Sequence, residues 1–331
     1  MSERGKVVIT DFLSDGLAPE RDGLGDLAEV VALNAHREEE LVDQIDNADA
    51  LMVYHNIAIT DRSIARLDGC KLIVRCGVGV DNIDVQAARR LGIPVANVPD
   101  YGTEEVADSA LAMALSLARG VHQLNSRLRR NEGAWRYTQA APLQRLRGSV
   151  FGIVGLGRIG TAVARRAKAI GMDVVFHDPY KPVGYDKALG IRQAASLQEL
   201  LRQSTIVTLH CPLTDETQHL INAETLSMMQ PRSFLINTAR GCVADTTAVV
   251  EAIASGQLAG AGLDVLPQEP PADEDPLIVA WRDPTHPAHD RLLINPHAAF
   301  YCEQGLADIR VKATQECRRA LLREPLRNVV N

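Results

Sequence analysis

Three side chains in the second half of the sequence have the chemistry of an acid–base site that binds a carboxylate. Arg240 carries a permanent charge on a planar fork that matches a carboxylate through two hydrogen bonds. His297 titrates near neutrality, so it can give a proton to an oxygen or take one from it. Glu269 can hydrogen-bond this imidazole and fix its tautomer. The three residues predict carboxylate binding and proton transfer at an oxygen of the substrate.

Each of these residues also has an ordinary structural interpretation. Arg240 fits a surface charge at the start of a helix, Glu269 a solvated acid in a loop, and His297 a capped turn. That interpretation is favoured for each residue taken singly. Because all three follow predicted strands beside a predicted nucleotide site, a functional site is favoured for the set.

A strand, a glycine-rich turn, a helix and a second strand follow one another from Ser149 to Asp178. Here Gly155 permits the tight turn, Gly157 lets backbone amides approach a pyrophosphate, and Gly160 lets the helix pack closely on the strand. The phosphates would lie at the helix N-terminus. A turn that needs glycines only for its own shape is the alternative, but the complete order of elements favours a dinucleotide site.

Asp178 ends the second strand of this unit, about 20 residues after the glycines. A carboxylate at that place accepts hydrogen bonds from the adenosine ribose. It would repel a 2′-phosphate, so the sequence favours NAD over NADP.

The elements that would position these side chains form two successive series. Short apolar strands that alternate with helices indicate a parallel sheet covered on both faces. The first series has predicted strands at 7–10, 29–33, 50–55, 71–75 and 95–98, and helices at 38–46, 61–66 and 85–91. The second series begins at Val150 and continues with strands at 206–210, 234–237, 260–265 and 292–295.

Three further segments lie outside this alternation. One long helix is predicted from Thr103 to about Arg130 and would cross between domains. Residues 273–291 contain three prolines and several charges, so they are predicted as a surface loop. A final helix at 303–322 would fold back onto the first series.

Length and composition exclude several classes of protein. A chain of 331 residues exceeds the length at which a single core stops growing, so two domains are expected. The net charge of −7, without a block of Lys and Arg, argues against nucleic acid and anionic membranes as partners. Neither a signal peptide nor a membrane span is predicted. Six cysteines without a CxxC pair indicate a reducing cytoplasm and no metal site.

Polar residues that follow strands are the main candidates for binding, because ligands of open α/β sheets lie beyond the carboxyl ends of the strands. In the first series, the glycine-rich stretch 75–84 leaves backbone amides available to hold an anion, although such a stretch is as often an ordinary turn. His55 also ends a predicted strand.

Five ordered motifs resemble those of the D-isomer-specific 2-hydroxyacid dehydrogenases and cover nearly the whole chain. They are Arg75-x-Gly-x-Gly-x-Asp-Asn-Ile-Asp84, Gly155 to Gly160 with Asp178, Asn237-Thr-Ala-Arg240-Gly, Asp264-Val with Glu269-Pro, and Pro296-His297-Ala-Ala. Within the family the chain looks most like the C-terminal binding protein branch. Stretches shared with that branch include 104–109, 208–211 and 297–304.

The resemblance implies roles for individual residues. Arg240, Glu269 and His297 would be catalytic, with Arg240 holding the substrate carboxylate and the other two forming the acid–base pair. The substrate would contact His55, Arg75, Val78, Gly79, Arg240, His297 and Phe300. The cofactor NAD would contact Val78, Thr103, Gly155, Leu156, Gly157, Arg158, Ile159, Gly160, Asp178, His210, Cys211, Pro212, Thr217, Thr238, Ala239, Arg240, Asp264 and His297.

The implied fold is α/β, with two doubly wound parallel-sheet domains and a cleft between them. Residues 1–101 and 298–331 would form a flavodoxin-like substrate domain, and residues 102–297 a Rossmann NAD-binding domain. The implied activity is NAD(H)-dependent interconversion of a small 2-keto acid and the D-2-hydroxy acid by a cytoplasmic homodimer.

Three departures from the family pattern bear on this expectation. Phe300 stands where the corepressors of the C-terminal binding protein branch carry tryptophan, and Ser109 stands where many family enzymes have histidine. The sequence stops at Asn331, without the long tail of the animal corepressors. An NADH-sensing scaffold with little turnover is the alternative outside enzymology. Formate or phosphite oxidation is the nearest enzymatic alternative, but that branch places glutamine at the position of Glu269.

Overall fold

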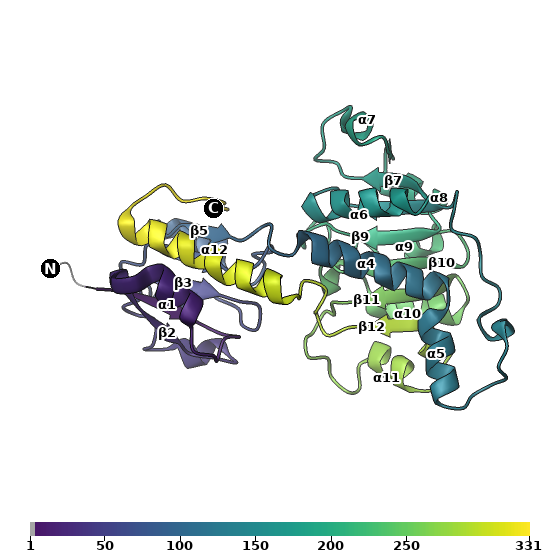
Figure 1. Cartoon of the computed structure of the whole chain (residues 1–331), viewed down its shortest axis with the longest axis horizontal. Helices are drawn as coiled ribbons and strands as arrows, with labels where there is room; N and C mark the ends of the chain where they lie inside the picture. The colour runs from purple at the N-terminus through teal and green to yellow at the C-terminus, as the bar shows by residue number, and fades with distance from the viewer. Residues whose placement is uncertain (1–3) are drawn as a thin grey trace. The chain divides into compact units, whose positions relative to one another are not determined.

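The computed structural model describes residues 4–331, which divide into two compact units (Figure 1). Unit 1 contains the described residues up to Gly102 together with Cys302–Asn331. Unit 2 is the continuous segment Thr103–Tyr301. In the described part of the chain, no helix combines the length and the apolar character needed to cross a membrane.

Unit 1 is built on a parallel sheet whose described strands follow the order β2-β1-β3-β4-β5. This is the strand order of flavodoxin-like folds. The sheet therefore confirms the predicted doubly wound architecture for this half of the protein. The strands are β1 Gly5–Ile9, β2 Ala28–Ala32, β3 Ala50–Val53, β4 Leu72–Arg75 and β5 Val95–Asn97.

The alternation of side chains along β1 shows how the sheet of unit 1 buries both faces. Val7 and Ile9 pack into the core that is shared with α1 (Ala18–Leu24) and α12 (Glu303–Leu322). Val8 packs into the opposite core, which includes residues of α2 (Asp61–Ile64) and α3 (Val85–Arg90). Successive residues of a strand point to opposite faces, so a strand covered on both sides must be apolar throughout.

A buried ion pair ties α12 to α1 within unit 1. The guanidinium of Arg310 donates two hydrogen bonds of 2.6 Å to the carboxylate of Glu20, whose side chain is fully buried. It also donates to both carboxylate oxygens of Asp15, at 2.5 and 3.0 Å. The last helix of the chain is therefore part of the core of the first unit.

Unit 2 contains a seven-stranded parallel sheet in the order β12-β11-β10-β9-β6-β7-β8. Numbered within the unit, this is the Rossmann order 3-2-1-4-5-6 with one more strand at the edge. The predicted Rossmann architecture is confirmed. The strands are β6 Val150–Val154, β7 Asp173–His177, β8 Arg192–Gln193, β9 Ile206–Leu209, β10 Ser233–Asn237, β11 Leu258–Leu263 and β12 Leu292–Ile294.

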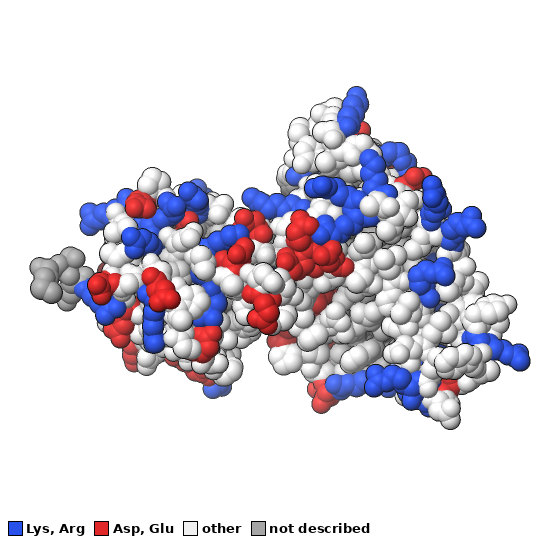
Figure 2. Space-filling model, viewed as in Figure 1, with Lys and Arg blue, Asp and Glu red and all other residues white. Residues whose placement is uncertain are grey.

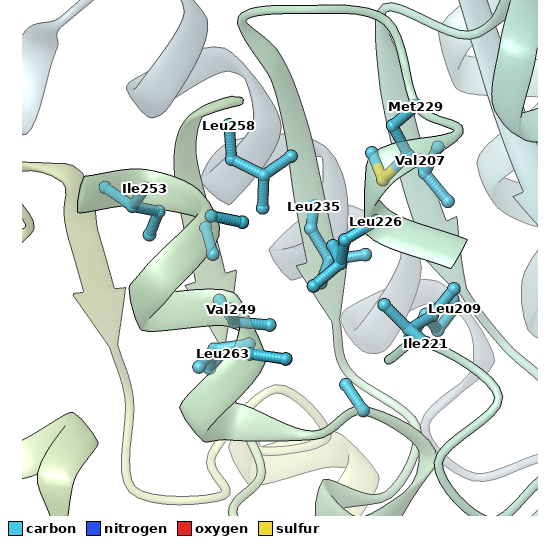
Figure 3. Packing of buried hydrophobic residues seen from close by; sticks show 14 of the residues in the cluster. Val207, Leu209, Ile221, Leu226, Met229, Leu235, Val249, Ile253, Leu258 and Leu263 are labelled. Atoms are coloured by element: carbon cyan, nitrogen blue, oxygen red, sulfur yellow. The ribbon is translucent and has the colours of Figure 1, made fainter. Parts of the chain in front are cut away.

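Helices cover both faces of this second sheet. On one face, α4 (Thr103–Ala118) and α6 (Arg158–Ala169) share a core with Phe151 and Ile153 of β6. On the other face, leucines, valines and isoleucines of β9, β10 and β11 meet those of α9 and α10 (Figure 3). The remaining helices are α5 Val121–Arg129, α7 Tyr185–Leu189, α8 Leu197–Gln203, α9 Ala223–Ser227, α10 Thr246–Ala254 and α11 Pro276–Arg282.

Ion pairs fix α4 against α6 on the surface of unit 2. Arg166 of α6 donates to Asp108 at 2.6 Å and to Glu104 at 2.5 Å, and both acids belong to α4. Acidic and basic residues accordingly adjoin on the visible face of this unit (Figure 2). These pairs orient the helix that begins unit 2.

The predicted single helix from Thr103 to about Arg130 is wrong, because the structure divides it into α4 and α5. Gly120 adopts a left-handed conformation with φ of 62° and precedes the first residue of α5. Its amide donates to the carbonyl of Leu117, which closes the last turn of α4. A glycine adopts this conformation without steric cost, so it can end one helix and redirect the chain.

The predictions for two other segments also need correction. Residues 273–291 are not a plain surface loop, because α11 lies within them and buries Leu277 and Ile278. Pro276 occupies the first turn of α11, where a missing amide hydrogen costs nothing, and Asp275 caps the helix. The predicted helix at 38–46 is only a short 3₁₀ helix, Glu38–Leu41, followed by turns.

Removing the buried carboxylate of Glu20 is expected to destabilise unit 1. Glu20→Gln should lower the free energy of unfolding by about 3 kcal/mol, because it leaves a buried guanidinium only partly compensated. Urea unfolding followed by circular dichroism measures the change. Glu40→Gln is the control, since Glu40 pairs with Arg37 in an exposed position and its loss should leave the urea midpoint unchanged. Equal midpoints for the two variants would contradict the structural role of the buried pair.

Candidate active site

The glycine turn after β6 has the geometry that each glycine was predicted to provide. Gly155 has φ of 87°, and a Cβ atom there would lie 2.8 Å from backbone atoms of His210 and Cys211. A Cβ atom on Gly160 would lie 2.2 Å from the carbonyl oxygen of Gly155. Around Gly157, by contrast, no described residue other than Gly157 and its two chain neighbours has an atom within 4 Å of the position of a Cβ atom. Two glycines therefore serve close backbone packing, and the third borders open space at the start of α6.

Asp178 follows β7, and the fold holds its carboxylate beside this turn. One oxygen accepts a hydrogen bond from the amide of Leu156 at 2.8 Å, and the other accepts from the amide of Tyr180 at 3.0 Å. The carboxylate is thus oriented by the backbone on both sides. A group held in this way can receive ribose hydroxyls without first reorganising.

The end of β9 forms the other side of the turn. His210 shares a hydrogen bond of 2.9 Å with the hydroxyl of Thr208, and burial lowers the pKa of His210 to about 3. Burial also raises the pKa of the Cys211 thiol to about 11. Both side chains are therefore neutral at pH 7, and neither adds charge beside the glycines.

The loop that follows β9 is organised by Thr217. Its hydroxyl donates to the carbonyl of Pro212 at 2.7 Å and accepts a hydrogen bond from the amide of Thr214 at 2.8 Å. These bonds fold residues 212–217 into a compact loop beyond the carboxyl end of the strand.

Arg240 lies in the loop after β10, which is shaped by Asn237. The side-chain oxygen of Asn237 accepts a hydrogen bond from the amide of Ala239 at 3.0 Å, and its NH₂ group donates to the carbonyl of Arg240 at 2.8 Å. The guanidinium of the half-buried Arg240 donates through Nη1 to the carbonyl of Ala239 at 2.7 Å. The orientation of the arginine therefore follows from the fold of its own loop.

The backbone brings the loop of Arg240 against the loop of Glu269. A Cβ atom on Gly241 would lie 2.0 Å from the carbonyl carbon of Leu266 and 2.3 Å from the nitrogen of Pro267. Only glycine permits this approach. The amide of Leu266 in turn donates to Oε1 of Glu269 at 2.8 Å, which fixes the carboxylate.

Glu269 and His297 form the predicted pair. Oε2 of Glu269 lies 2.7 Å from Nδ1 of His297, and their side chains are 35% and 24% exposed. A carboxylate accepts hydrogen bonds, so this contact favours the tautomer that carries the proton on Nδ1. Nε2 is then the ring nitrogen that can accept or give up a proton in a reaction.

A buried acid at the end of β11 holds the turn that contains His297. Asp264 is 2% exposed, and its carboxylate accepts hydrogen bonds from the amides of Ala298 and Ala299 at 2.9 to 3.0 Å. Its carbonyl accepts from the amide of His297 at 2.7 Å. Burial raises the pKa of Asp264, although the amide hydrogen bonds oppose this shift. The network stabilises His297 in a left-handed conformation with φ of 50°.

Two more side chains of unit 2 adjoin this turn. The ring of Phe300 meets the imidazole of His297 edge-on, with centroids 6.2 Å apart. The hydroxyl of Ser109 in α4 donates to the carbonyl of Ala299 at 3.2 Å. Ser109 departs from many family enzymes and belongs to the shared stretch 104–109, but its contact with the histidine turn was not predicted. In the loop after β10, the hydroxyl of Thr238 is buried and has no hydrogen-bond partner in the described part of the chain. A buried hydroxyl of this kind is suited to hydrogen-bond a ligand.

Unit 1 carries the remaining predicted site residues. Arg75 ends β4 and is 6% exposed, and its Nη1 donates to the carbonyl of Cys76 at 3.0 Å. A Cβ atom on Gly77 would lie 1.3 Å from that Nη1, so the glycine makes room for the folded-back guanidinium. The ring of His55 lies 5.0 Å from that of Phe12. The roles of His55, Arg75, Val78 and Gly79 in substrate binding stay predictions.

Unit 2 thus gathers two groups of predicted residues at the carboxyl ends of its strands. The first contains the glycine turn, Asp178 and the end of β9. The second contains Arg240, Glu269, Asp264 and His297. Open space at Gly157, a backbone-held carboxylate at Asp178 and the buried hydroxyl of Thr238 fit a dinucleotide. Among the described residues, no group of three or more His, Cys, Asp and Glu side chains is placed to hold a metal ion.

Comparison with known sequences gives a family for this geometry. Residues 111–299 match the model of the D-isomer specific 2-hydroxyacid dehydrogenase, NAD binding domain. The chain is 33% identical to a D-3-phosphoglycerate dehydrogenase of Methanocaldococcus jannaschii over 326 residues, which are 98% of this chain and 59% of that protein. It is 34% identical to C-terminal-binding protein 1 of Caenorhabditis elegans over 305 residues, 90% of this chain and 41% of that protein. The chain therefore spans about half the length of the curated relatives it matches.

A solved structure extends the likeness to the whole fold. The D-lactate dehydrogenase of Aquifex aeolicus, complexed with NAD and lactic acid, superposes with a TM-score of 0.85 and 29% sequence identity. The match covers 98% of each chain. The fold and the sequence agree: the chain belongs to the D-isomer specific 2-hydroxyacid dehydrogenase family, and residues 111–299, within unit 2, match the NAD-binding domain of that family.

Proposed function

We propose that the protein is an NAD(H)-dependent oxidoreductase that interconverts a small 2-keto acid and the D-2-hydroxy acid. The observation that carries the proposal is the 2.7 Å contact between Nδ1 of His297 and Glu269, whose loop lies against that of Arg240. When bound, NADH would supply the hydride for the keto carbon. The complex of the Aquifex aeolicus relative with NAD and lactic acid supports this reaction class.

The side chains of unit 2 divide the remaining work. Arg240 binds the substrate carboxylate and neutralises its charge, because a guanidinium pairs with a carboxylate through two parallel hydrogen bonds. His297 delivers a proton from Nε2 to the keto oxygen and takes it back in the reverse reaction. Glu269 holds the imidazole through Nδ1 and stabilises the imidazolium form.

We propose further that unit 1 is the substrate domain. Open α/β sheets bind ligands beyond the carboxyl ends of their strands. Arg75 ends β4, Val78 and Gly79 follow it, and His55 follows β3. Backbone amides in this glycine-rich stretch suit a carboxylate. Phe300 would limit the size of the substrate side chain.

A regulatory scaffold that senses NADH is the second candidate, favoured by the likeness to C-terminal-binding protein 1. A cytoplasmic location is proposed for either function. Its support is that all six cysteines are free, which suits a reducing compartment.

A screen of keto acids distinguishes the two candidates. The purified protein is mixed with NADH and glyoxylate, pyruvate, hydroxypyruvate or phenylpyruvate, and NADH absorbance is followed. Oxidation of NADH with any of these acids supports the enzyme. Tight binding of NADH without oxidation in the presence of all of them favours the scaffold.

Replacing His297 is expected to abolish most turnover. His297→Asn should lower kcat/KM for the best keto acid about 10²- to 10⁴-fold, because the proton is no longer delivered at the keto oxygen. Arg240→Lys should mainly raise the KM, since an ammonium group cannot reproduce the two-pronged contact. Steady-state kinetics with NADH measures both. His36→Asn, at an exposed position of unit 1, is the control. Wild-type kinetics in either site variant would refute the assigned role.

The open space at Gly157 predicts an effect on cofactor binding without an effect on stability. Gly157→Ala should weaken NADH binding at least about tenfold, because the methyl group would occupy the space that the pyrophosphate needs. Its melting temperature should match that of the wild type. Gly160→Ala should instead lower the melting temperature, since its methyl group would collide with the backbone. Gly16→Ala also meets open space and should change neither property.

We propose a homodimer, supported by apolar side chains that unit 2 exposes near α5. Trp135 is 87% exposed, Tyr137 85% and Val121 59%. Aromatic residues that are exposed on a single chain are typical of surfaces that become buried at the centre of an interface between two chains. Sedimentation velocity of the wild type should give a dimer, and Trp135→Ser with Tyr137→Ser should give a monomer. Val183→Ser removes an equally exposed apolar group elsewhere on unit 2 and should leave the dimer intact.

A further inference from the structure

A hydrogen bond between two loops of unit 2 crosses the end of the strand that carries the glycine turn. The hydroxyl of Tyr180 donates to Oε2 of Glu216 at 2.5 Å. Tyr180 lies in the turn after β7, and Glu216 lies in the loop after β9. In the sheet, β6 lies between β7 and β9. The bond therefore joins the two loops that flank the carboxyl end of β6.

This bond places a second carboxylate near Asp178. The amide of Tyr180 donates to Asp178, while the phenol at the other end of the same residue donates to Glu216. The pKa of the Tyr180 phenol is raised, mainly by its hydrogen bond to Glu216 and also by the negative charges of Glu216 and Asp178. Two acids, one from each loop, thus act on the same phenol.

We propose that Glu216, positioned by Tyr180, is a second residue that makes the nucleotide site prefer NADH to NADPH. The inference rests on the proposed cofactor site, in which Asp178 receives the adenosine ribose. A 2′-phosphate carries a charge between −1 and −2 near neutral pH. It would lie between Asp178, which follows β7, and Glu216, in the loop after β9. Each carboxylate repels the phosphate, whereas the ribose hydroxyl of NADH carries no charge to repel.

Two basic residues in the neighbouring segments would act in the opposite direction. Arg158 is exposed in the first turn of α6, and a helix N-terminus attracts phosphate. Lys181 follows Tyr180, and its ammonium lies 5.2 Å from the centroid of the Tyr185 ring. Both cations would attract a 2′-phosphate. Asp178 alone would oppose two positive groups, whereas Asp178 and Glu216 together balance them.

The test compares three variants that keep their surroundings. Glu216→Gln removes the charge, and Tyr180→Phe keeps the charge but releases it from its position. Asp215→Asn is the matched control, because it makes the same change of charge at the neighbouring exposed residue, for which no contact with Tyr180 is found. Dissociation constants of NADH and NADPH are measured for each protein by nucleotide fluorescence, at low salt and again at 0.5 M salt. Melting temperatures verify that each variant is folded.

The quantity compared is the ratio of the NADPH to the NADH dissociation constant. We expect Glu216→Gln to lower this ratio about three- to tenfold at low salt, because an exposed charge acts with moderate strength. Tyr180→Phe should lower it by a smaller factor, and Asp215→Asn should leave it unchanged. The effect of Glu216→Gln should shrink at 0.5 M salt, where charges are screened over a few ångströms.

Other results would overturn the proposal. Equal ratios for Glu216→Gln and Asp215→Asn would mean that Glu216 has no special position, and a wild-type ratio in Tyr180→Phe would remove the role of the tyrosine. The measurement needs no turnover, so the inference is tested separately from the activity. A wild-type protein that binds NADH but reduces no keto acid would refute the proposed reaction and leave this inference standing. A protein that binds neither nucleotide would refute the cofactor site and the inference together.

Discussion

The candidate active site depends on a buried carboxylate that holds a short turn. Asp264 directly follows β11, and its side chain and carbonyl together accept hydrogen bonds from the amides of three successive residues beginning at His297. Those hydrogen bonds offset the cost of a left-handed backbone at a histidine. With the turn fixed, Nδ1 of the imidazole meets Glu269. An acid with no assigned part in the proton transfer is therefore what gives the proton-transferring residue its position.

Close backbone contacts provide the same kind of control elsewhere in unit 2. Gly241 allows the loop of Arg240 to lie directly against the backbone of Leu266, and Leu266 anchors Glu269 through its amide. Gly155 and Gly160 allow comparable contacts around the turn after β6. The two groups of functional side chains thus lie on closely packed backbone. Pre-organisation of this kind reduces the entropy lost when a ligand is bound.

Much of the architecture could be predicted from the sequence, because the patterns concerned are local. Glycine spacing with a following acid indicates a βαβ unit, and apolar strands alternating with helices indicate parallel sheets. The wrong predictions concern segments in which one local sequence pattern is compatible with two different structures. Gly120 lies inside a helical pattern and ends it, while Pro276 looks like a breaker and begins a helix. The single helix at 103–130 and the surface loop at 273–291 were therefore predicted wrongly.

Contacts between distant segments could not be predicted in the same way. The proximity of Ser109 to Ala299, or of Tyr180 to Glu216, depends on the order of strands in the sheet and on rotamers, which no single segment encodes. The candidate pair of Glu269 and His297 could be predicted because both residues follow predicted strands and each belongs to a motif. Without motifs, a serine and a tyrosine give no signal of their contacts.

The pairing of Glu20 with Arg310 has a consequence for the order in which the chain folds during its synthesis on the ribosome. The two residues are separated by 290 positions, and the carboxylate of Glu20 is fully buried only when α12 is in place. Unit 2, in contrast, is one uninterrupted segment. The nascent chain can thus complete unit 2 while the earlier-made half of unit 1 still exposes an unpaired acid and the apolar face that α12 will cover. The part of the protein that is translated first is therefore the part that completes its fold last. Until α12 is made, that part would need protection by chaperones.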